Sequence, residues 1–182
     1  MPAYVYFLVA SATILWFVPF IFARTKRRAA LELDRRARWG MALECLAYSL
    51  LWQSSFWERR PEWWRVAVSV ALFALACVIS WTGARALGRQ YRFDAALNAR
   101  HELVRSGPYR FVRHPIYTSM LCVLLATGVL VAPTYLLLVA VALFLAGTEI
   151  RMRVEDQLLE SQFGPQFRDY QRSVPRFIPL LK

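Results

Sequence analysis

Residues 116–147 read IYTSMLCVLLATGVLVAPTYLLLVAVALFLAG and contain no charged side chain. A single helix over this run would be about 48 Å long at 1.5 Å per residue, which exceeds the hydrocarbon core of a bilayer. Pro133 interrupts the run near its middle, and proline cannot continue the hydrogen-bond ladder of a helix. The run therefore predicts two antiparallel helices with a turn at Ala132-Pro133-Thr134. Because each would be short for a span, the second is expected to continue into the polar sequence after Gly147.

Three further apolar segments precede this hairpin, at residues 4–23, 39–57 and 63–87. Each is close to the length of about 20 residues that crosses a hydrocarbon core. The first lacks the basic residues before it and the small-residue cleavage site after it that a signal peptide would have, which favours a retained helix. The chain is 58% hydrophobic with a formal net charge of +11. The sequence thus predicts an all-α polytopic membrane protein with about five transmembrane helices, the last two a tight hairpin, and a short cytoplasmic C-terminal helix.

Basic residues gather in three places, between the first and second spans, between the third and fourth, and after the fifth. On the opposite side only Arg59, Arg60 and Arg65 appear, and the hairpin tip has none. The positive-inside rule then places the N-terminus outside and the C-terminus in the cytoplasm, in a prokaryotic inner membrane. Contact with anionic lipid headgroups explains arginines split among three loops more simply than a nucleic-acid partner does, so no nucleic acid is expected.

A dense polar segment lies directly before the hairpin and holds both histidines of the chain, His101 and His114. Ser106-Gly-Pro-Tyr109 is predicted to be a turn in which Gly107 takes a positive φ. Pro115 suits the first turn of the fourth span, and a helix start favours a carboxylate such as that of an amino-acid cofactor. Polar groups beside a span are costly and so are functional candidates. The residues leave open the alternative of an interfacial anchor that contacts headgroups.

Charged residues also follow the fifth span. Glu149 and Arg153 are spaced four residues apart, as are Arg151 and Glu155, so the helix is predicted to continue out of the membrane. Beyond it, residues 163–170 predict a turn and a short amphipathic helix, and residues 174–179 predict an extended end restricted by proline.

Other polar residues within the predicted spans are few. Glu44 and Gln53 lie in the second span and are expected to face other helices or the interface. Cys45, Cys77 and Cys122 are widely separated and lack metal-type spacing, which favours buried structural cysteines and no metal site.

Two separated motifs resemble the isoprenylcysteine carboxyl methyltransferases and related phospholipid methyltransferases. The first is His101-x-Leu-Val-x-x-Gly-Pro-Tyr-Arg-x-Val-Arg-His-Pro-x-Tyr117. The second is Arg151-x-Arg-Val-Glu-Asp-x-Leu-Leu, followed by Phe163-Gly, Tyr170 and Val174-Pro-Arg-Phe-Ile-Pro179. The resemblance covers about residues 100–179, whereas the first three spans match only in number and character.

The resemblance implies an integral membrane enzyme that uses S-adenosylmethionine and releases S-adenosylhomocysteine. Residues 100–182 would bind the cofactor on the cytoplasmic side, and residues 1–99 would form a three-helix membrane region of the same integrated domain. Asp156 departs from the family, which usually has glutamate there. The residues implied to line or shape the pocket are His101, Tyr109, Arg113, His114, Pro115, Tyr117, Glu155 and Asp156.

A sulfonium methyl group is already activated, so its transfer depends mainly on positioning and desolvation. Arg151 or Arg153 is expected to orient a carboxylate acceptor, and Glu149 or Glu155 to take up the proton of an amine acceptor. The acceptor expected first is a lipophilic isoprenylcysteine carboxylate that enters laterally from the bilayer, which makes the chain a carboxyl O-methyltransferase. A phospholipid amine or a small thiol is the alternative acceptor. An NADPH-dependent membrane reductase, which has a similar C-terminal architecture, and a non-catalytic membrane protein are further alternatives.

Overall fold

The computed structural model describes residues 1–23, 36–53, 60–88 and 103–178. These ranges contain helices and no strand, which confirms the all-α prediction. A short 3₁₀ helix at Gly107–Arg110, with Gly107 at a φ of +60°, confirms the predicted turn. The α-helices are α1 (Ala3–Ala23), α2 (Arg36–Leu50), α3 (Trp63–Leu87), α4 (Pro115–Val131), α5 (Thr134–Phe163) and α6 (Pro165–Ser173).

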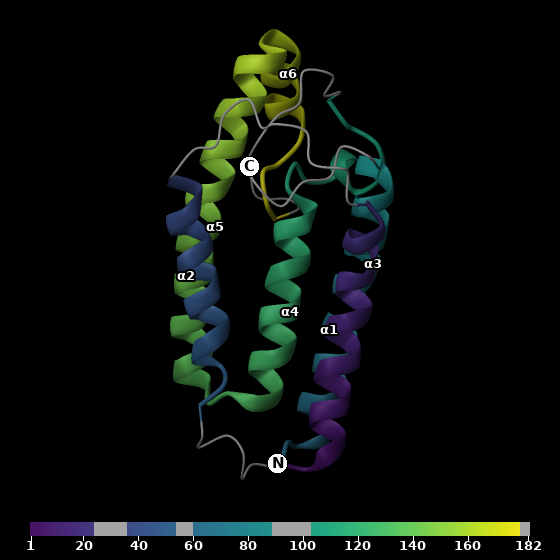
Figure 1. Ribbon diagram of the computed structural model, residues 1–182, viewed down its shortest axis with the longest axis vertical. Helices are drawn as coiled ribbons and strands as arrows, with labels where there is room; N and C mark the ends of the chain where they lie inside the picture. Colours follow the sequence, from purple (N-terminus) through teal and green to yellow (C-terminus); the bar gives the residue numbers. More distant parts are fainter. Residues whose placement is uncertain (24–35, 54–59, 89–102, 179–182) are drawn as a thin grey trace.

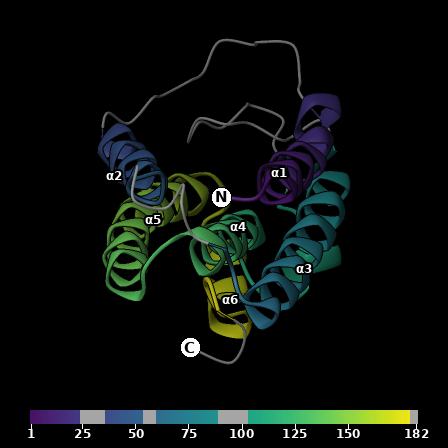
Figure 2. The ribbon, with the colours of Figure 1, turned by 90° about the horizontal axis from the view of Figure 1, so that it is seen from below.

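Helices α1 to α5 run side by side along the long axis, and each runs opposite to the one before it (Figure 1). Seen along the bundle, α2 lies against α5, α1 lies against α3, and α4 lies between these two pairs (Figure 2). The start of α1 and the turn between α4 and α5 lie at one end of the bundle, whereas α6 lies at the other (Figure 1). The chain therefore begins and finishes its helical part at opposite ends.

The predicted hairpin is confirmed. Helix α4 ends at Val131 and α5 begins at Thr134, so Pro133 stands just outside both helices. The N–H of Ala132 closes the last turn of α4 by donating to the carbonyl of Gly128 at 2.8 Å. Helix α5 then continues for 30 residues to Phe163, well past the apolar run, as expected. The same helix thus carries an apolar half and a charged half.

Three helices in the described ranges, α1, α3 and α5, are long and apolar enough to cross a membrane, and α4 is a shorter apolar helix of 17 residues. The predictions for residues 4–23 and 63–87 are confirmed. The prediction for 39–57 is wrong at residues 51–53, because α2 ends at Leu50, and its last part, 54–57, lies outside the described residues. The last turn tightens there through i to i+3 hydrogen bonds, and Trp52 and Gln53 are exposed beyond it. In the sequence, Ser54 and Ser55 follow, and serine side chains compete for backbone hydrogen bonds and so disfavour a helix.

Helices α2 and α5 approach until their backbones touch. A Cβ atom on Gly40 would lie 2.6 Å from the carbonyl oxygen of Gly147, and one on Gly147 would lie 2.5 Å from that of Gly40. Such small residues let membrane helices pack closely, where van der Waals contact is the main attraction. Tyr48 of α2 then packs edge-on against Phe144 of α5 with ring centres 6.1 Å apart, and its hydroxyl donates to the Met120 carbonyl of α4 at 2.7 Å.

Hydrogen bonds connect α1 to α3 and α4. The indole of Trp16 donates to the hydroxyl of the buried Ser119 at 3.0 Å, and Ser80 donates to the Trp16 carbonyl at 3.1 Å. In an apolar environment, such bonds spare these groups the cost of remaining unsatisfied. The cysteines match their prediction only in part: Cys122 is buried, but Cys45 is on an exposed face of α2.

Replacing Gly147 with alanine is expected to destabilise the fold, because the added methyl group would lie 2.5 Å from the carbonyl oxygen of Gly40. Overpacking of this kind costs about 1–3 kcal/mol, which should lower the melting temperature of the detergent-purified protein. Gly83→Ala is the matched control, because the nearest atom to its new methyl group would be at 3.8 Å, an ordinary contact. Equal melting temperatures for the two variants would contradict the close contact of α2 with α5.

Candidate functional site

His114 lies between two carboxylates at the start of α4. Its Nε2 is 2.9 Å from Oδ1 of Asp156, and its Nδ1 is 3.3 Å from Oε2 of Glu155. Burial by itself would lower the pKa of His114, but the hydrogen bonds with Asp156 and Glu155 outweigh it and raise the pKa above its usual value. With a carboxylate at each ring nitrogen, both N–H groups of an imidazolium form have a partner, and His114 connects the start of α4 to α5.

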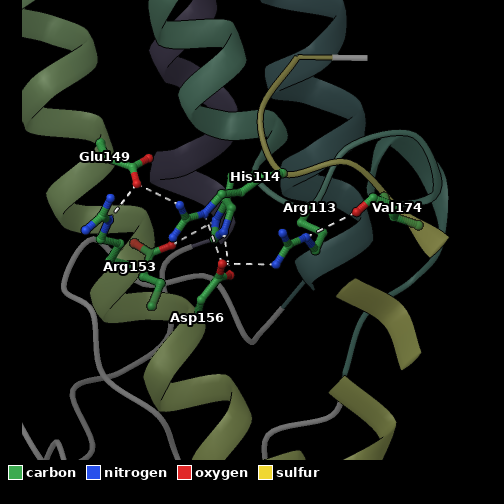
Figure 3. A network of polar contacts seen from close by, with 8 residues as sticks. Arg113, His114, Glu149, Arg153, Asp156 and Val174 are labelled. Carbon is green, nitrogen blue, oxygen red and sulfur yellow. Dashed lines mark hydrogen bonds and ion pairs between the residues drawn. The ribbon is translucent and has the colours of Figure 1, made fainter. Parts of the chain in front are cut away.

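Asp156 is also the centre of a wider set of ion pairs (Figure 3). Its Oδ2 accepts from Nη1 of Arg113 at 3.0 Å and lies 3.0 Å from Nε of Arg176. Nη1 of Arg176 also lies 2.9 Å from Oε1 of Glu149, and the same oxygen is 2.6 Å from Nε of Arg153. The predicted pair Glu149–Arg153 is therefore present, and Arg176 connects it to Asp156.

The segment that carries Arg176 is held against the start of α4 by backbone groups. The N–H of Arg113 donates to the carbonyl of Pro175 at 2.9 Å, and the N–H of His114 donates to that of Arg176 at 3.1 Å. The hydroxyl of Thr118 donates to the carbonyl of Phe177 at 2.7 Å. These bonds satisfy donors that precede and open α4, and so fix residues 174–178 beside the ion pairs.

Tyr117, in the first turn of α4, connects Glu155 to a second group of charges. Its hydroxyl donates to Oε1 of Glu155, and the guanidinium carbon of Arg151 lies 4.8 Å from the centre of its ring. Nη1 of Arg151 is 2.6 Å from Oε2 of Glu44 on α2, and the hydroxyl of Thr148 donates to Oε1 of Glu44 at 3.0 Å. Glu44 thus faces a neighbouring helix, as its place in the second span predicted.

The remaining predicted site residues have different positions. Tyr109 is buried, and its carbonyl accepts a hydrogen bond from the Tyr170 hydroxyl, so it supports the turn before α4. Pro115 is the first residue of α4 and is buried. The side chain of Arg153 is 70% exposed. His101 lies outside the described residues.

Sequence reasoning missed two members of this arrangement. Arg176 belongs to the quoted C-terminal motif, and a basic residue in that motif was the available signal for it. Glu44 was noted as a polar residue in a span, but nothing in the sequence indicated that its partner is Arg151, 107 residues away.

The residues brought together by α4, α5 and the C-terminal segment form what we term the polar cluster: Arg113, His114, Tyr117, Glu155, Asp156 and Arg176. It combines cations, which donate hydrogen bonds to a carboxylate, with carboxylates, which accept them from an ammonium group. A zwitterionic amino-acid group requires both. Glu155 and Arg176 are its more accessible members, with side chains 28% and 26% exposed. An amino-acid ligand therefore fits the chemistry of the cluster at its open edge.

The raised pKa of His114 predicts a stability that depends on pH. Because the folded state holds this proton more tightly than the unfolded state, the contribution of His114 is fully present below its unfolded pKa of about 6.5 and is lost as pH rises through the folded pKa. The melting temperature of the wild type should therefore fall, relative to His114→Gln, as the pH rises above about 6.5. Parallel pH profiles of the two proteins would contradict this assignment, whatever the absolute stability of the variant.

Comparisons with known proteins agree with this arrangement. Residues 64–166 match the phospholipid methyltransferase family. The cobalt-zinc-cadmium resistance protein CzcN of Cupriavidus metallidurans is 40% identical over 82 residues, which cover 43% of this chain and 36% of the relative. The nickel-cobalt-cadmium resistance protein NccN of Alcaligenes xylosoxydans xylosoxydans is 32% identical over 136 residues, 65% of this chain and 63% of the relative.

A third relative is named as an enzyme. Protein-S-isoprenylcysteine O-methyltransferase B of Arabidopsis thaliana is 26% identical over 125 residues, 67% of this chain and 63% of the relative. The chain thus matches between about one third and two thirds of the length of these curated relatives. The family match takes in more than half of the chain and contains α4, α5 and all of the polar cluster except Arg176. The chain belongs to the phospholipid methyltransferase family.

Proposed function

We propose that this protein transfers a methyl group from S-adenosylmethionine to a lipophilic acceptor at the cytoplasmic face of a prokaryotic inner membrane. The observation that carries the proposal is the position of the polar cluster. Its α5 carboxylates, Glu155 and Asp156, follow the uncharged run that ends at Gly147 by two to three helical turns of the same helix. A polar cofactor held there would lie beside apolar helices that a lipid tail can contact.

The cluster has a group for each charge of the cofactor's amino-acid part. Arg113 and Arg176 would hold its carboxylate, and Glu155 would hold its ammonium group. His114, whose two ring nitrogens pair with Glu155 and Asp156, would shape the pocket by fixing these carboxylates. When bound, S-adenosylmethionine supplies a methyl group that is already activated on a sulfonium. The protein's own residues bind, orient and exclude water, which are the contributions that such a transfer needs.

Arg151 is the residue that we assign to the acceptor. It follows Gly147 by about one helical turn, at the level where the apolar run gives way to charge, and its guanidinium lies over the Tyr117 ring. An arginine at this level would orient the carboxylate head of an acceptor whose tail stays in lipid. The name of the Arabidopsis relative supports a carboxylate as the first acceptor to test.

An amine is the second acceptor, and Glu155 favours it. This carboxylate reaches both His114 and Tyr117 and is partly open, so it could accept the proton that an amine loses. Arg153 and Glu149, the two remaining candidates for contact with the acceptor, are assigned a smaller role in the reaction. Arg153 is largely exposed, and Glu149 is paired with both Arg153 and Arg176.

The cofactor is tested by calorimetric titration of the detergent-purified protein with S-adenosylhomocysteine. Glu155→Gln and Arg176→Gln should each weaken binding by about 10-fold to 100-fold, since hydrogen bonds to charged groups contribute roughly 1.5–3 kcal/mol. The matched controls are Glu160→Gln and Arg172→Gln, whose side chains are 43% and 82% exposed and pair with Arg168 and Asp169 of α6, outside the polar cluster. Saturable binding of NADPH in place of S-adenosylhomocysteine would assign the protein to the reductases, and binding of neither would reject the cofactor site.

The acceptor is tested with a radiolabelled methyl donor and three acceptors in vesicles: a farnesylated cysteine, phosphatidylethanolamine and a long-chain thiol. Transfer to a carboxylate gives an ester, so the label should be released as methanol by mild base. Label that stays non-volatile after base treatment would instead indicate transfer to nitrogen or sulfur and would reject the carboxylate assignment. Omission of the acceptor is the control for methylation of the protein itself.

A further inference from the structure

Glu44 is a carboxylate inside the helix bundle, on α2 and only 2% exposed. It lies before residue 64, outside the part of the chain that matches the family. Both of its oxygens are engaged, Oε2 with Arg151 at 2.6 Å and Oε1 with Thr148 at 3.0 Å. Both partners are on α5, so the carboxylate joins the N-terminal membrane region directly to the helix that carries the site.

Two glycines make this contact possible, and they do so reciprocally. Gly40 lies one turn before Glu44, and a Cβ there would come within 2.6 Å of Cγ of Arg151. Gly147 lies one turn before Arg151, and a Cβ there would come within 3.2 Å of Cγ of Glu44. Each glycine therefore leaves space for the charged side chain of the other helix. The conformation of the Arg151 side chain therefore depends on α2, through the space at Gly40 and the pairing with Glu44.

From Glu44 a continuous set of contacts reaches the polar cluster. The Arg151 guanidinium that Glu44 holds lies 4.8 Å from the centre of the Tyr117 ring, and the Tyr117 hydroxyl donates to Glu155. The side chains of Glu44 and Arg151 are 3% and 12% exposed, so solvent screens this pair little. The position of the guanidinium thus depends on a residue of a different helix.

Stability alone does not account for such a pair. Apolar side chains of similar volume would hold two helices together at least as well, because a buried ion pair must first be desolvated. Removing one partner, in contrast, leaves an unpaired buried charge and is strongly destabilising. A buried pair whose arginine faces the site is better explained by the orientation that it imposes.

We infer that Glu44 is a positioning residue for methyl transfer, which holds the Arg151 guanidinium over Tyr117 where it meets the head of the acceptor. The inference rests on the proposed function, because it assigns the acceptor to Arg151. It adds that the N-terminal membrane region takes part in the reaction through α2. It also predicts that Glu44 affects turnover of the acceptor and leaves cofactor binding unchanged.

Glu44→Gln is the first variant, because it keeps the shape and removes the charge. We expect kcat/KM for the acceptor to fall by about 10-fold to 100-fold, as for loss of a charge-assisted contact, while the Kd of S-adenosylhomocysteine stays within about 2-fold. Glu44→Asp, which keeps the charge, should recover part of the lost turnover. Glu160→Gln, an exposed carboxylate farther along α5, is the matched control and should behave as the wild type.

A double variant separates positioning from folding. Glu44→Leu combined with Arg151→Met removes both charges, so it should recover the melting temperature lost in Glu44→Gln but not the turnover. Recovery of turnover together with stability would overturn the inference, since the pair would then be purely structural. Wild-type turnover in a folded Glu44→Gln protein would overturn it too, as would a loss of cofactor binding equal to the loss of turnover.

A readout without catalysis distinguishes this inference from the proposed function. With 3-fluorotyrosine at position 117, the ¹⁹F chemical shift reports the guanidinium above the ring. Glu44→Gln and Arg151→Gln should move this shift in the same direction, and Glu160→Gln should not. An inactive wild type with this pattern would reject the proposed function and retain Glu44 as the residue that positions Arg151. An unchanged shift in Glu44→Gln would reject the positioning role itself.

Discussion

The pairing of His114 with Asp156 and Glu155 is the interaction on which the rest of the site depends. It joins residues 42 positions apart in the chain, at the end of the bundle opposite the short α4–α5 turn. With the turn at one end and the charges at the other, α4 and α5 are held at both ends. The segment 174–178 can then pair its carbonyls with the N–H groups of Arg113 and His114, and so bring Arg176 to Asp156. The contacts of the 174–178 segment therefore depend on where His114 and Asp156 are held.

The charged residues of α5 lie next to its apolar run, where burial is costly but contact with a lipophilic acceptor is possible. Helix α5 is uncharged to Gly147 and strongly charged beyond it, so one element provides both the contact with lipid and the polar groups of the site. Close to the apolar run, an unpaired charge would be expensive. Arg151 is accordingly paired with Glu44, whereas Arg153, on another face of the helix, is left exposed. Two arginines only two residues apart on one helix thus differ in burial, because Arg151 faces α2 and Arg153 does not.

The close contact of α2 with α5 gives the N-terminal region a place in this arrangement. Membrane helices lack a hydrophobic drive toward one another, so small residues and polar contacts must hold them together. Gly40 and Gly147 supply the first, and Glu44 with Arg151 and Thr148 supplies the second. The family match begins after α2, yet the carboxylate that pairs with Arg151 comes from that helix. The contacts of Arg151 therefore extend beyond the part of the chain that matches the family.

Local chemistry in the sequence was enough to place the hairpin turn at Pro133, the turn at Gly107 and the continuation of α5, because proline, glycine and apolar length act on the backbone where they stand. Most members of the polar cluster were instead indicated by the resemblance of two motifs to a known family. Local chemistry could not select which carboxylate meets which arginine, since that depends on how helices are rotated and where the chain returns. The partners of Arg151 and Arg176 were decided by tertiary packing alone.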